Sequence, residues 1–177
     1  MTKAKSHHAH ETELVVTTKS SSEAIVNKYL PWAMGVGFIP SAVLITAGVA
    51  GIQIKMLSEI SKVYGQPFSE TRARSIVISL LGGMAPGALG GVVGGVLASI
   101  PFVGGWLLPA TAPLLAGAST YAVGKIFIQH FESGGTFLSF DSVKAKELFA
   151  ERFAEGKAEA SKVASSLNAK LAAVVDI

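Results

Sequence analysis

The feature that most constrains this chain is a long stretch without charge. Between Arg74 and Lys125 no side chain carries a formal charge. Glycine recurs through this stretch at every fourth position, at Gly83, Gly87, Gly91 and Gly95. A helix with about 3.6 residues per turn places such glycines in one slowly drifting row, where a second backbone can approach closely, as in small-xxx-small packing within lipid. The stretch therefore predicts a membrane hairpin that carries a helix-contact face.

The composition agrees with a membrane protein. Half of the residues are hydrophobic, only 15% are charged, and the mean hydropathy is +0.49; soluble domains carry about 25% charged residues. The net charge of +3 suits anionic lipid headgroups, but the basic residues are scattered and not interleaved with aromatics, so we expect no nucleic-acid partner. The chain contains no cysteine, which excludes disulfides, thiolate metal sites and a thiol nucleophile. Its first residues contain no apolar core of a secretory signal.

The pattern of charge divides the chain into three regions and predicts an all-α fold. Residues 1–22 are polar and rich in Ser, Thr and His, which indicates a tail. Residues 23–130 form a membrane domain, in which apolar spans at 29–54 and 75–124 are joined by an amphipathic segment at 55–74. Residues 141–177 form an amphipathic helix. The expected architecture is membrane-embedded helical hairpins followed by that C-terminal helix.

Prolines and glycines suggest where the helices end. Pro40 removes a backbone donor within the first span, so the span is either one crossing helix or two half-helices, and the sequence leaves both open. Gly65 and Pro67 predict the end of a short helix at Tyr64. The second span is long enough for two crossings, with a turn at 100–105.

The C-terminal helix has its apolar and charged residues on different faces. It is too charged to span a membrane, so it either lies on the surface or packs against a second copy of itself. The apolar stripe includes Phe153, Val163, Leu167 and Leu171. Together with the glycine row, these residues are the candidates for helix packing and self-association.

Basic residues flank every apolar span, which bears on orientation. By the positive-inside rule, all the polar regions are expected on the cytoplasmic side, for which a bacterial inner or internal membrane is the setting. They share one side only if the first span re-enters at Pro40 and the second is a hairpin. We favour that topology over three crossings.

Candidate chemistry is sparse. The segment Gly117–Lys125 resembles a phosphate loop superficially, but Ser119 stands where the first glycine is needed and Ile126 follows the lysine. His7, His8 and His10 are weak metal candidates, because a polar tail needs no ligand to explain them. His130 is more simply a boundary residue than a proton relay. The intramembrane hydroxyls either line a pore or satisfy kinked backbone, and we favour the second role. We therefore expect no catalytic residue, no cofactor and no enzyme activity.

The segment from residue 37 to residue 74 carries a family resemblance. An apolar span with a central proline leads into a Lys-Met pair, a short helix, a Tyr-Gly-Gln-Pro turn and an Arg-containing helix. Those positions are Pro40, Lys55, Met56, Tyr64, Gly65, Gln66, Pro67, Arg72 and Arg74. This pattern, over about residues 28–130, resembles the YcjF-like domain-of-unknown-function family of GTPase-associated bacterial membrane proteins. The resemblance implies a membrane module without known catalytic residues, and any GTPase would be a separate polypeptide because this chain has no Walker sequence.

These observations lead to a functional hypothesis. The chain is predicted to be a non-enzymatic integral membrane protein that contacts the lipid bilayer and self-associates as a homo-oligomeric scaffold or membrane-shaping element, with a separate GTPase as a further partner. The alternatives are an oligomeric pore formed by the glycine-rich hairpin and a peripheral assembly whose apolar spans are buried between subunits.

Overall fold

The computed structural model describes residues 2–82 and 108–175, and within them the side chains of 15–41, 43–81 and 111–174. This part of the chain is all-α, as predicted. Its helices are α1 (Thr2–Val36), α2 (Ala42–Val63), α3 (Glu70–Gly82), α5 (Leu108–Glu132) and α6 (Ser142–Val175). The four glycines of the predicted row lie outside the described residues.

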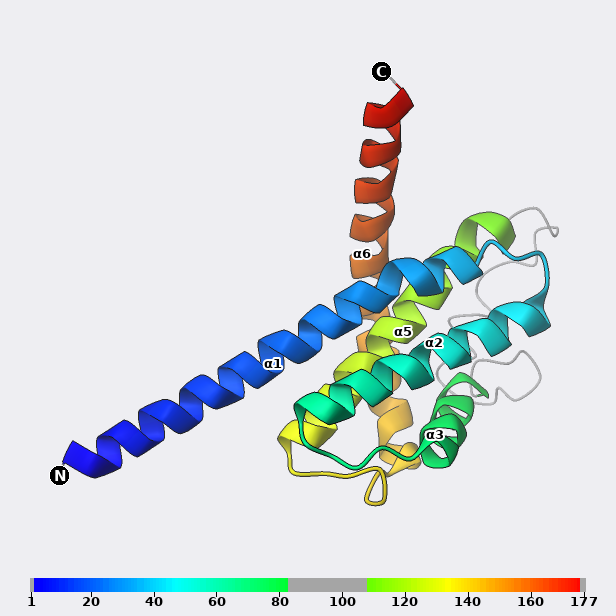
Figure 1. Cartoon of the computed structure of the whole chain (residues 1–177). Coiled ribbons are helices and arrows are strands. Elements are labelled where there is room, and N and C mark those ends of the chain that lie inside the picture. Colours follow the sequence, from blue (N-terminus) through cyan, green and yellow to red (C-terminus); the bar gives the residue numbers. More distant parts are fainter. Residues whose placement is uncertain (1, 83–107, 176–177) are drawn as a thin grey trace.

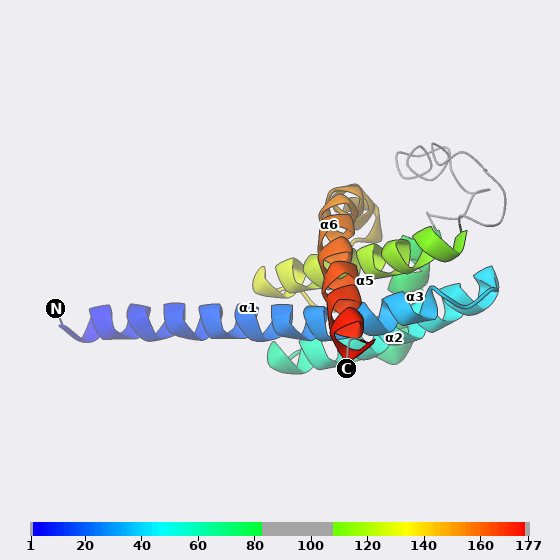
Figure 2. The same ribbon diagram turned by 90° about the horizontal axis from the view of Figure 1, so that it is seen from above.

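Helix α5 lies at the centre of the fold. It contacts α1, α2, α3 and α6. Figures 1 and 2 show that α1, α2 and α5 run alongside one another, with α1 antiparallel to the other two. Helix α6 crosses this layer, and its C-terminal part then extends away from the other helices. Among the described residues, the N-terminal part of α1 and the C-terminal part of α6 thus extend beyond the bundle.

Small residues let the neighbours of α5 approach its backbone closely. A β-carbon placed on Gly156 of α6 would lie 2.6 Å from the carbonyl oxygen of Ala118 in α5. On α5 itself, a β-carbon on Gly117 would lie 2.8 Å from Met34, and one on Gly124 would lie 2.5 Å from Val26. The sequence therefore contains a glycine-based packing device, but among the described residues it joins helices of one chain.

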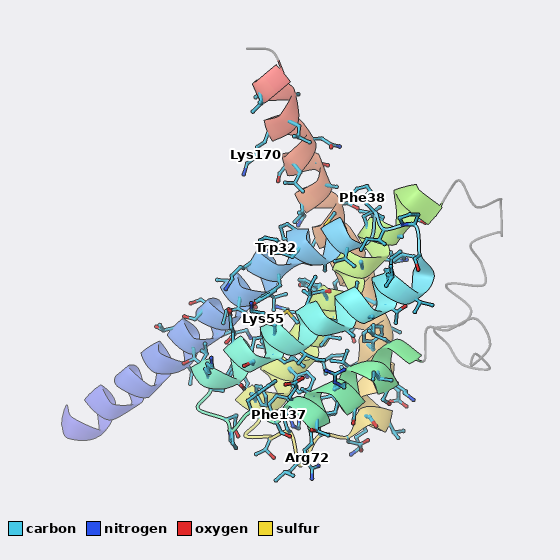
Figure 3. The ribbon with its side chains drawn as sticks, turned by 45° about the vertical axis from the view of Figure 1, so that its right-hand side comes forward. Trp32, Phe38, Lys55, Arg72, Phe137 and Lys170 are labelled. Atoms are coloured by element: carbon cyan, nitrogen blue, oxygen red, sulfur yellow. The ribbon has the colours of Figure 1, made fainter. Side chains whose placement is uncertain are left out.

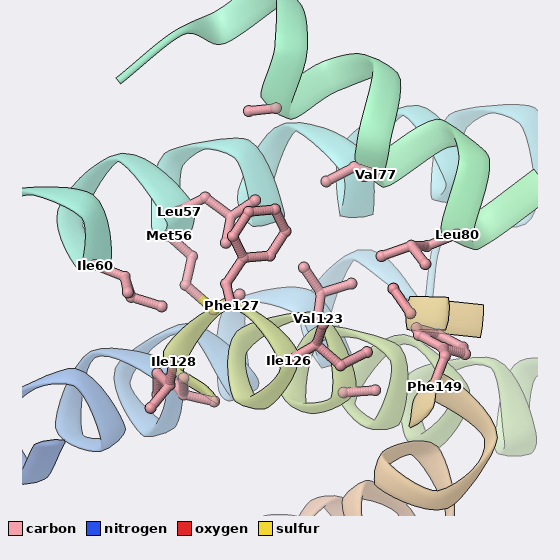
Figure 4. Packing of buried hydrophobic residues seen from close by; sticks show 14 of the residues in the cluster. Met56, Leu57, Ile60, Val77, Leu80, Val123, Ile126, Phe127, Ile128 and Phe149 are labelled. Atoms are coloured by element: carbon pink, nitrogen blue, oxygen red, sulfur yellow. The ribbon is translucent and has the colours of Figure 1, made fainter. Parts of the chain in front are cut away.

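The hydrophobic core surrounds the second half of α5. Figure 4 shows Met56, Leu57 and Ile60 of α2 facing Phe127, while Val77 and Leu80 of α3 approach from the other side. All of these side chains are at most 2% exposed. Phe149 and Phe153 extend the core onto α6. Burial of each such side chain contributes about 1.5–3 kcal/mol to folding, so the core alone fixes the relative positions of four helices.

The first apolar span is divided between two helices. Helix α1 ends at Val36 and α2 begins at Ala42, with Pro40 between them. Gly37 packs directly on α5, because a β-carbon there would lie 2.5 Å from Pro113 Cα. Pro113 itself lies inside α5, near the start of that helix. Of the two forms that the sequence left open, the structure has the two-helix form.

Two segments differ from the expected division of the chain. Residues 2–22, expected as a tail, are the start of α1, because helix extends at little cost per residue once its buried part, from Ser22 to Met34, is fixed by α5. Residues 55–63, expected as a separate amphipathic helix, continue α2 without a break, since nothing between Ala42 and Val63 interrupts the backbone pattern. Residues 55–63 have one buried face, which includes Met56, Leu57 and Ile60, but they form the end of a longer helix.

The contact between α5 and α6 can be tested by filling it. We expect Gly156→Val to lower the free energy of unfolding by about 1–3 kcal/mol, because the new side chain meets backbone atoms of Ala118 that cannot move aside. Gly51→Val is the matched control, since a β-carbon on Gly51 of α2 meets nothing within 4 Å. Thermal unfolding in mild detergent, followed by circular dichroism, measures both. Equal stability of the two variants would contradict the close approach.

Candidate functional site

Exposed apolar side chains gather where α1 turns into α2. The exposed fraction is 68% for Trp32, 68% for Phe38 and 77% for Val43. We call the set Trp32, Phe38, Ile39, Val43 and Leu44 the apolar tip. Figure 3 shows Trp32 and Phe38 near this turn, away from Arg72 and Phe137. A patch of this kind on a protein surface marks a site of contact with another apolar phase or partner.

The geometry of the helix pair makes the tip protrude. Gly48 of α2 packs against Val36, the last residue of α1, with its β-carbon position 2.7 Å from Val36 Cγ1. The first turns of α2 therefore extend past the end of α1, beside the 37–41 connection. Because Pro40 prevents this connection from being helical, its Phe38 and Ile39 side chains remain on the outside.

Ion pairs between helices form a second zone, which we call the charged girdle. Lys125 Nζ lies 2.6 Å from Glu23 Oε1, and Lys28 Nζ lies 2.8 Å from Glu59 Oε2. A longer pair, at 3.6 Å, joins Lys19 and Glu132. The girdle connects α1 to α2 and to α5. Each pair is partly exposed and is worth at most about 1 kcal/mol, so the girdle positions the helices more than it stabilises them.

A buried polar contact lies between the tip and the girdle. Gln53 Nε2 donates to Ser119 Oγ and Thr120 Oγ1, each at 3.3 Å, and all three side chains are buried. Ser119 also donates to the carbonyl of Ala116 at 2.9 Å. The two hydroxyls accept hydrogen bonds from Gln53 Nε2 within the chain, whereas Gln53 Oε1 has no hydrogen-bond partner among the described residues. The arrangement gives no support to a pore that they would line.

Helix α2 is long and apolar enough to cross a membrane. Among the described residues, Val43–Val63 is the one segment that meets this criterion by length and composition. Only 33% of its most apolar window is buried within the chain. Helix α5, in which the second crossing was expected, is instead largely enclosed by α1, α2 and α6. Its apolar residues are thus mostly explained by packing within the protein.

The Tyr-Gly-Gln-Pro signature is a helix-terminating motif. Gly65 has a positive φ of 63°, its N–H donates to Lys62 O, and the N–H of Gln66 donates to Ser61 O at 2.8 Å. This pair of hydrogen bonds is the Schellman arrangement, with Tyr64 as the last half-helical residue. Burial raises the pKa of the Tyr64 hydroxyl, and the Tyr64 ring packs beside that of Phe131. The predicted stop at Tyr64 is confirmed.

The other signature residues are spread over the molecule. Pro40 lies in the tip, Lys55 is exposed on α2 and Met56 is fully buried in the core. Arg72 and Arg74 are exposed on α3, where Arg74 pairs with Glu70 at 3.1 Å. The signature therefore does not converge on one site. It records a turn, a core contact and an exposed basic surface.

The residues predicted for helix packing fall into different environments. Phe153 is 4% exposed and belongs to the chain's own core. Val163 is half-buried, whereas Leu167 and Leu171 are exposed on the free part of α6. The tip residues Phe38, Ile39, Val43 and Leu44 were not singled out from the sequence. Their signal was present in the uncharged neighbours of Pro40.

The described side chains offer little for metal or acid–base chemistry. Among them, no group of three or more His, Asp and Glu side chains is placed to hold a metal ion. His7, His8 and His10 lie on α1 in the part whose side chains are not described. His130 Nε2 lies 2.9 Å from Thr136 O and its ring packs on Phe140, which indicates a structural role in the α5–α6 connection.

The fold and these zones define an all-α protein with an uncharged apolar tip above a girdle of ion pairs. The chain belongs to the family described as Domain of unknown function (DUF697), whose model matches residues 1–158. A curated relative, magnetosome membrane protein 22 of Magnetospirillum gryphiswaldense, is 35% identical over 156 residues, which are 88% of this chain and 78% of the relative. No solved structure matches the chain.

The turn after α2 can be tested through its left-handed glycine. We expect Gly65→Ala to cost about 1–2 kcal/mol of unfolding free energy, because a β-carbon disfavours positive φ. Gly35→Ala, within α1 and with open space around it, is expected to be neutral or slightly stabilising. Chemical denaturation in detergent measures both. A Gly65→Ala variant as stable as the parent chain would exclude a structural requirement for this motif.

Proposed function

We propose that this chain is a non-enzymatic membrane protein whose apolar tip is embedded in the bilayer from one face. The observation that carries the proposal is the exposure of Phe38, Val43 and Leu44 at the uncharged end of a well-packed fold. Water would have to hydrate this surface in a soluble protein. Lipid would remove it from water at no cost to the core.

Two further observations support embedding. The candidate segment Val43–Val63 is mostly unburied, whereas the core helix of a soluble protein that passes the same test is mostly buried. A relative that is 35% identical over 156 residues is named a magnetosome membrane protein. The family's name assigns no activity. The polar contacts described above hold helices together and stabilise turns.

The charged girdle sets the depth of insertion. Lys28, Lys55 and Lys125 are the first charged residues met on leaving the uncharged parts of α1, α2 and α5. In this orientation the girdle lies at the headgroups, where lysines attract anionic lipids. The positive-inside rule then places the polar regions in the cytoplasm, beneath a bacterial inner or internal membrane.

The role that follows is a scaffold or membrane-shaping element. If the apolar tip is inserted from one face, it occupies more area in one leaflet than in the other. Such an imbalance favours membrane curvature. Self-association through Gly83, Gly87, Gly91 and Gly95 is part of the proposal and rests on their spacing in the sequence. A separate GTPase as partner rests on the YcjF-like resemblance alone.

Charges placed in the tip test the embedding. We expect the double variant Val43→Asp, Leu44→Asp to lose at least tenfold in vesicle flotation, because each aspartate costs about 3 kcal/mol in the hydrocarbon. Val15→Asp, Val16→Asp is the matched control, since these valines are each 61% exposed on α1 but lie outside the tip. Equal flotation of both variants would overturn the proposal. So would release of the parent protein into carbonate supernatant.

Labelling with a thiol reagent tests one-sided insertion. The chain has no cysteine, so single cysteines at Ser20, Gln66 and Ser161 can be probed with a membrane-impermeant reagent in intact cells and inverted vesicles. We expect all three to react from the cytoplasmic side only. Reaction of Gln66 from the side opposite to Ser20 would show that α2 crosses the bilayer.

A further inference from the structure

The free part of α6 carries an apolar stripe that continues a buried helix face. Phe149, Phe153 and Gly156 face α5 within the bundle. At helical spacing the same face goes on to Val163, Leu167, Leu171 and Val174, of which the last two are 64% and 70% exposed. We call these four residues the α6 stripe. Within the described residues, Leu167 reaches the end of α1, whereas Leu171 and Val174 lie beyond the bundle.

An open apolar cleft joins the α6 stripe to the apolar tip. The cleft has a volume of about 500 Å³ and lies between the end of α1 and α6. Its lining is Pro31, Trp32, Gly35, Val36, Ile39 and Leu167. Trp32 and Ile39 belong to the tip, and Leu167 belongs to the stripe. The two exposed apolar surfaces are therefore continuous.

Lys170 lies beside the α6 stripe, about 60° around the helix from Leu167, whereas Lys162 lies about 140° from Leu167, near the opposite face. Beyond Ala160, the described part of α6 contains Lys162 and Lys170 and no acidic residue. Glu159, one turn earlier, accepts a hydrogen bond from Lys162 and holds the pKa of that lysine above its usual value. Figure 3 shows Lys170 on the free part of α6, on the same side of the molecule as Trp32 and Phe38.

We propose that the free part of α6 is an interfacial helix, which lies in the plane of an anionic membrane surface with its apolar stripe in the lipid and an acyl chain in the Trp32–Leu167 cleft. This inference rests on the proposed embedding of the tip. Figures 1 and 2 show that α6 leaves the bundle in a direction that crosses the axes of α1, α2 and α5. If those three helices point into the bilayer, a helix that crosses them can lie in the plane of the membrane. Lysines beside a shallow apolar stripe are typical of such helices.

A second copy of the chain fits this surface less well. Two copies paired along the α6 stripe would place Lys170 of each copy at the edge of an apolar contact, where its charge needs an acidic partner. Anionic headgroups supply that charge along the whole helix.

Fluorophores attached at single cysteines test the inference in vesicles of phosphatidylglycerol and phosphatidylcholine. Leu171→Cys reports the α6 stripe, Ser165→Cys reports the opposite face, and Val43→Cys reports the tip. Each carries an environment-sensitive label, and spin-labelled lipid is the quencher. We expect quenching at Leu171 and Val43 but not at Ser165. Because the natural sequence has no cysteine, each variant carries its label at one position only.

The possible outcomes separate the two proposals. Quenching at Val43 without quenching at Leu171 overturns the interfacial helix and leaves the embedded tip standing. Quenching at neither position overturns both. The label at Leu171 can also report apolar surroundings without being quenched by lipid. If it does so equally in detergent, above a threshold protein concentration, the occupant of the stripe is a second copy and the inference is overturned.

The basic flank gives an independent measurement. We expect Lys170→Gln to lower binding to the anionic vesicles by about fivefold at low salt, and to have little effect with phosphatidylcholine alone. Lys162→Gln is the matched control, because this exposed lysine lies near the opposite face of the same helix. Equal losses in the two variants would show that these lysines act only through net charge, and would overturn the role of the flank.

Discussion

The close approach of backbones along α5 is the constraint on which the rest of the structure depends. Ala118 touches Gly156 of α6, while Gly117 and Gly124 receive Met34 and Val26 of α1. Larger residues at these glycines would separate the helices by the size of a side chain. Because α1 lies directly on α5, Lys125 reaches Glu23 at 2.6 Å and the girdle can close. The same contacts determine where α6 leaves the bundle.

Charge is separated along these helices, and the packing turns that separation into two zones. On each of α1, α2 and α5, the charged residues lie toward one end and an uncharged stretch lies toward the other. Antiparallel packing of α1 brings its uncharged end beside the uncharged ends of α2 and α5. A sequence pattern distributed over distant segments thus becomes one apolar end and one polar end. Such an axis is what a protein needs to take a fixed depth in a bilayer.

Local signals predicted local structure well. Gly65 and Pro67 indicated the end of α2 correctly, because a left-handed glycine followed by proline has few other uses. Pro40 marked the division of the first span for a similar reason. The helix at 2–22 was missed, since its polar residues show no period and are ordered by contacts that begin only near Ser22.

Which glycines make contacts could not be read from spacing alone. The regular row at Gly83–Gly95 was conspicuous, whereas Gly156 stands among charged residues and has no spaced partner on its own helix. Its function depends on Ala118, a residue far away in the sequence, and only tertiary structure brings the two together. The apolar tip was hidden for the same reason. A uniformly apolar span does not reveal which of its side chains α5 will cover.

The length of the uncharged part of α2 argues for insertion from one side. From Ala42 to Ile54 the helix rises about 20 Å, which is less than the about 30 Å of a bilayer's hydrocarbon core. A full crossing would draw Lys55 and Glu59 into the lipid, and Glu59 is already engaged by Lys28 and Tyr29 of α1. Breaking that contact to move α2 alone would expose the core at Met56 and Leu57. These contacts therefore support the proposed insertion, in which the protein enters past one leaflet without leaving by the other.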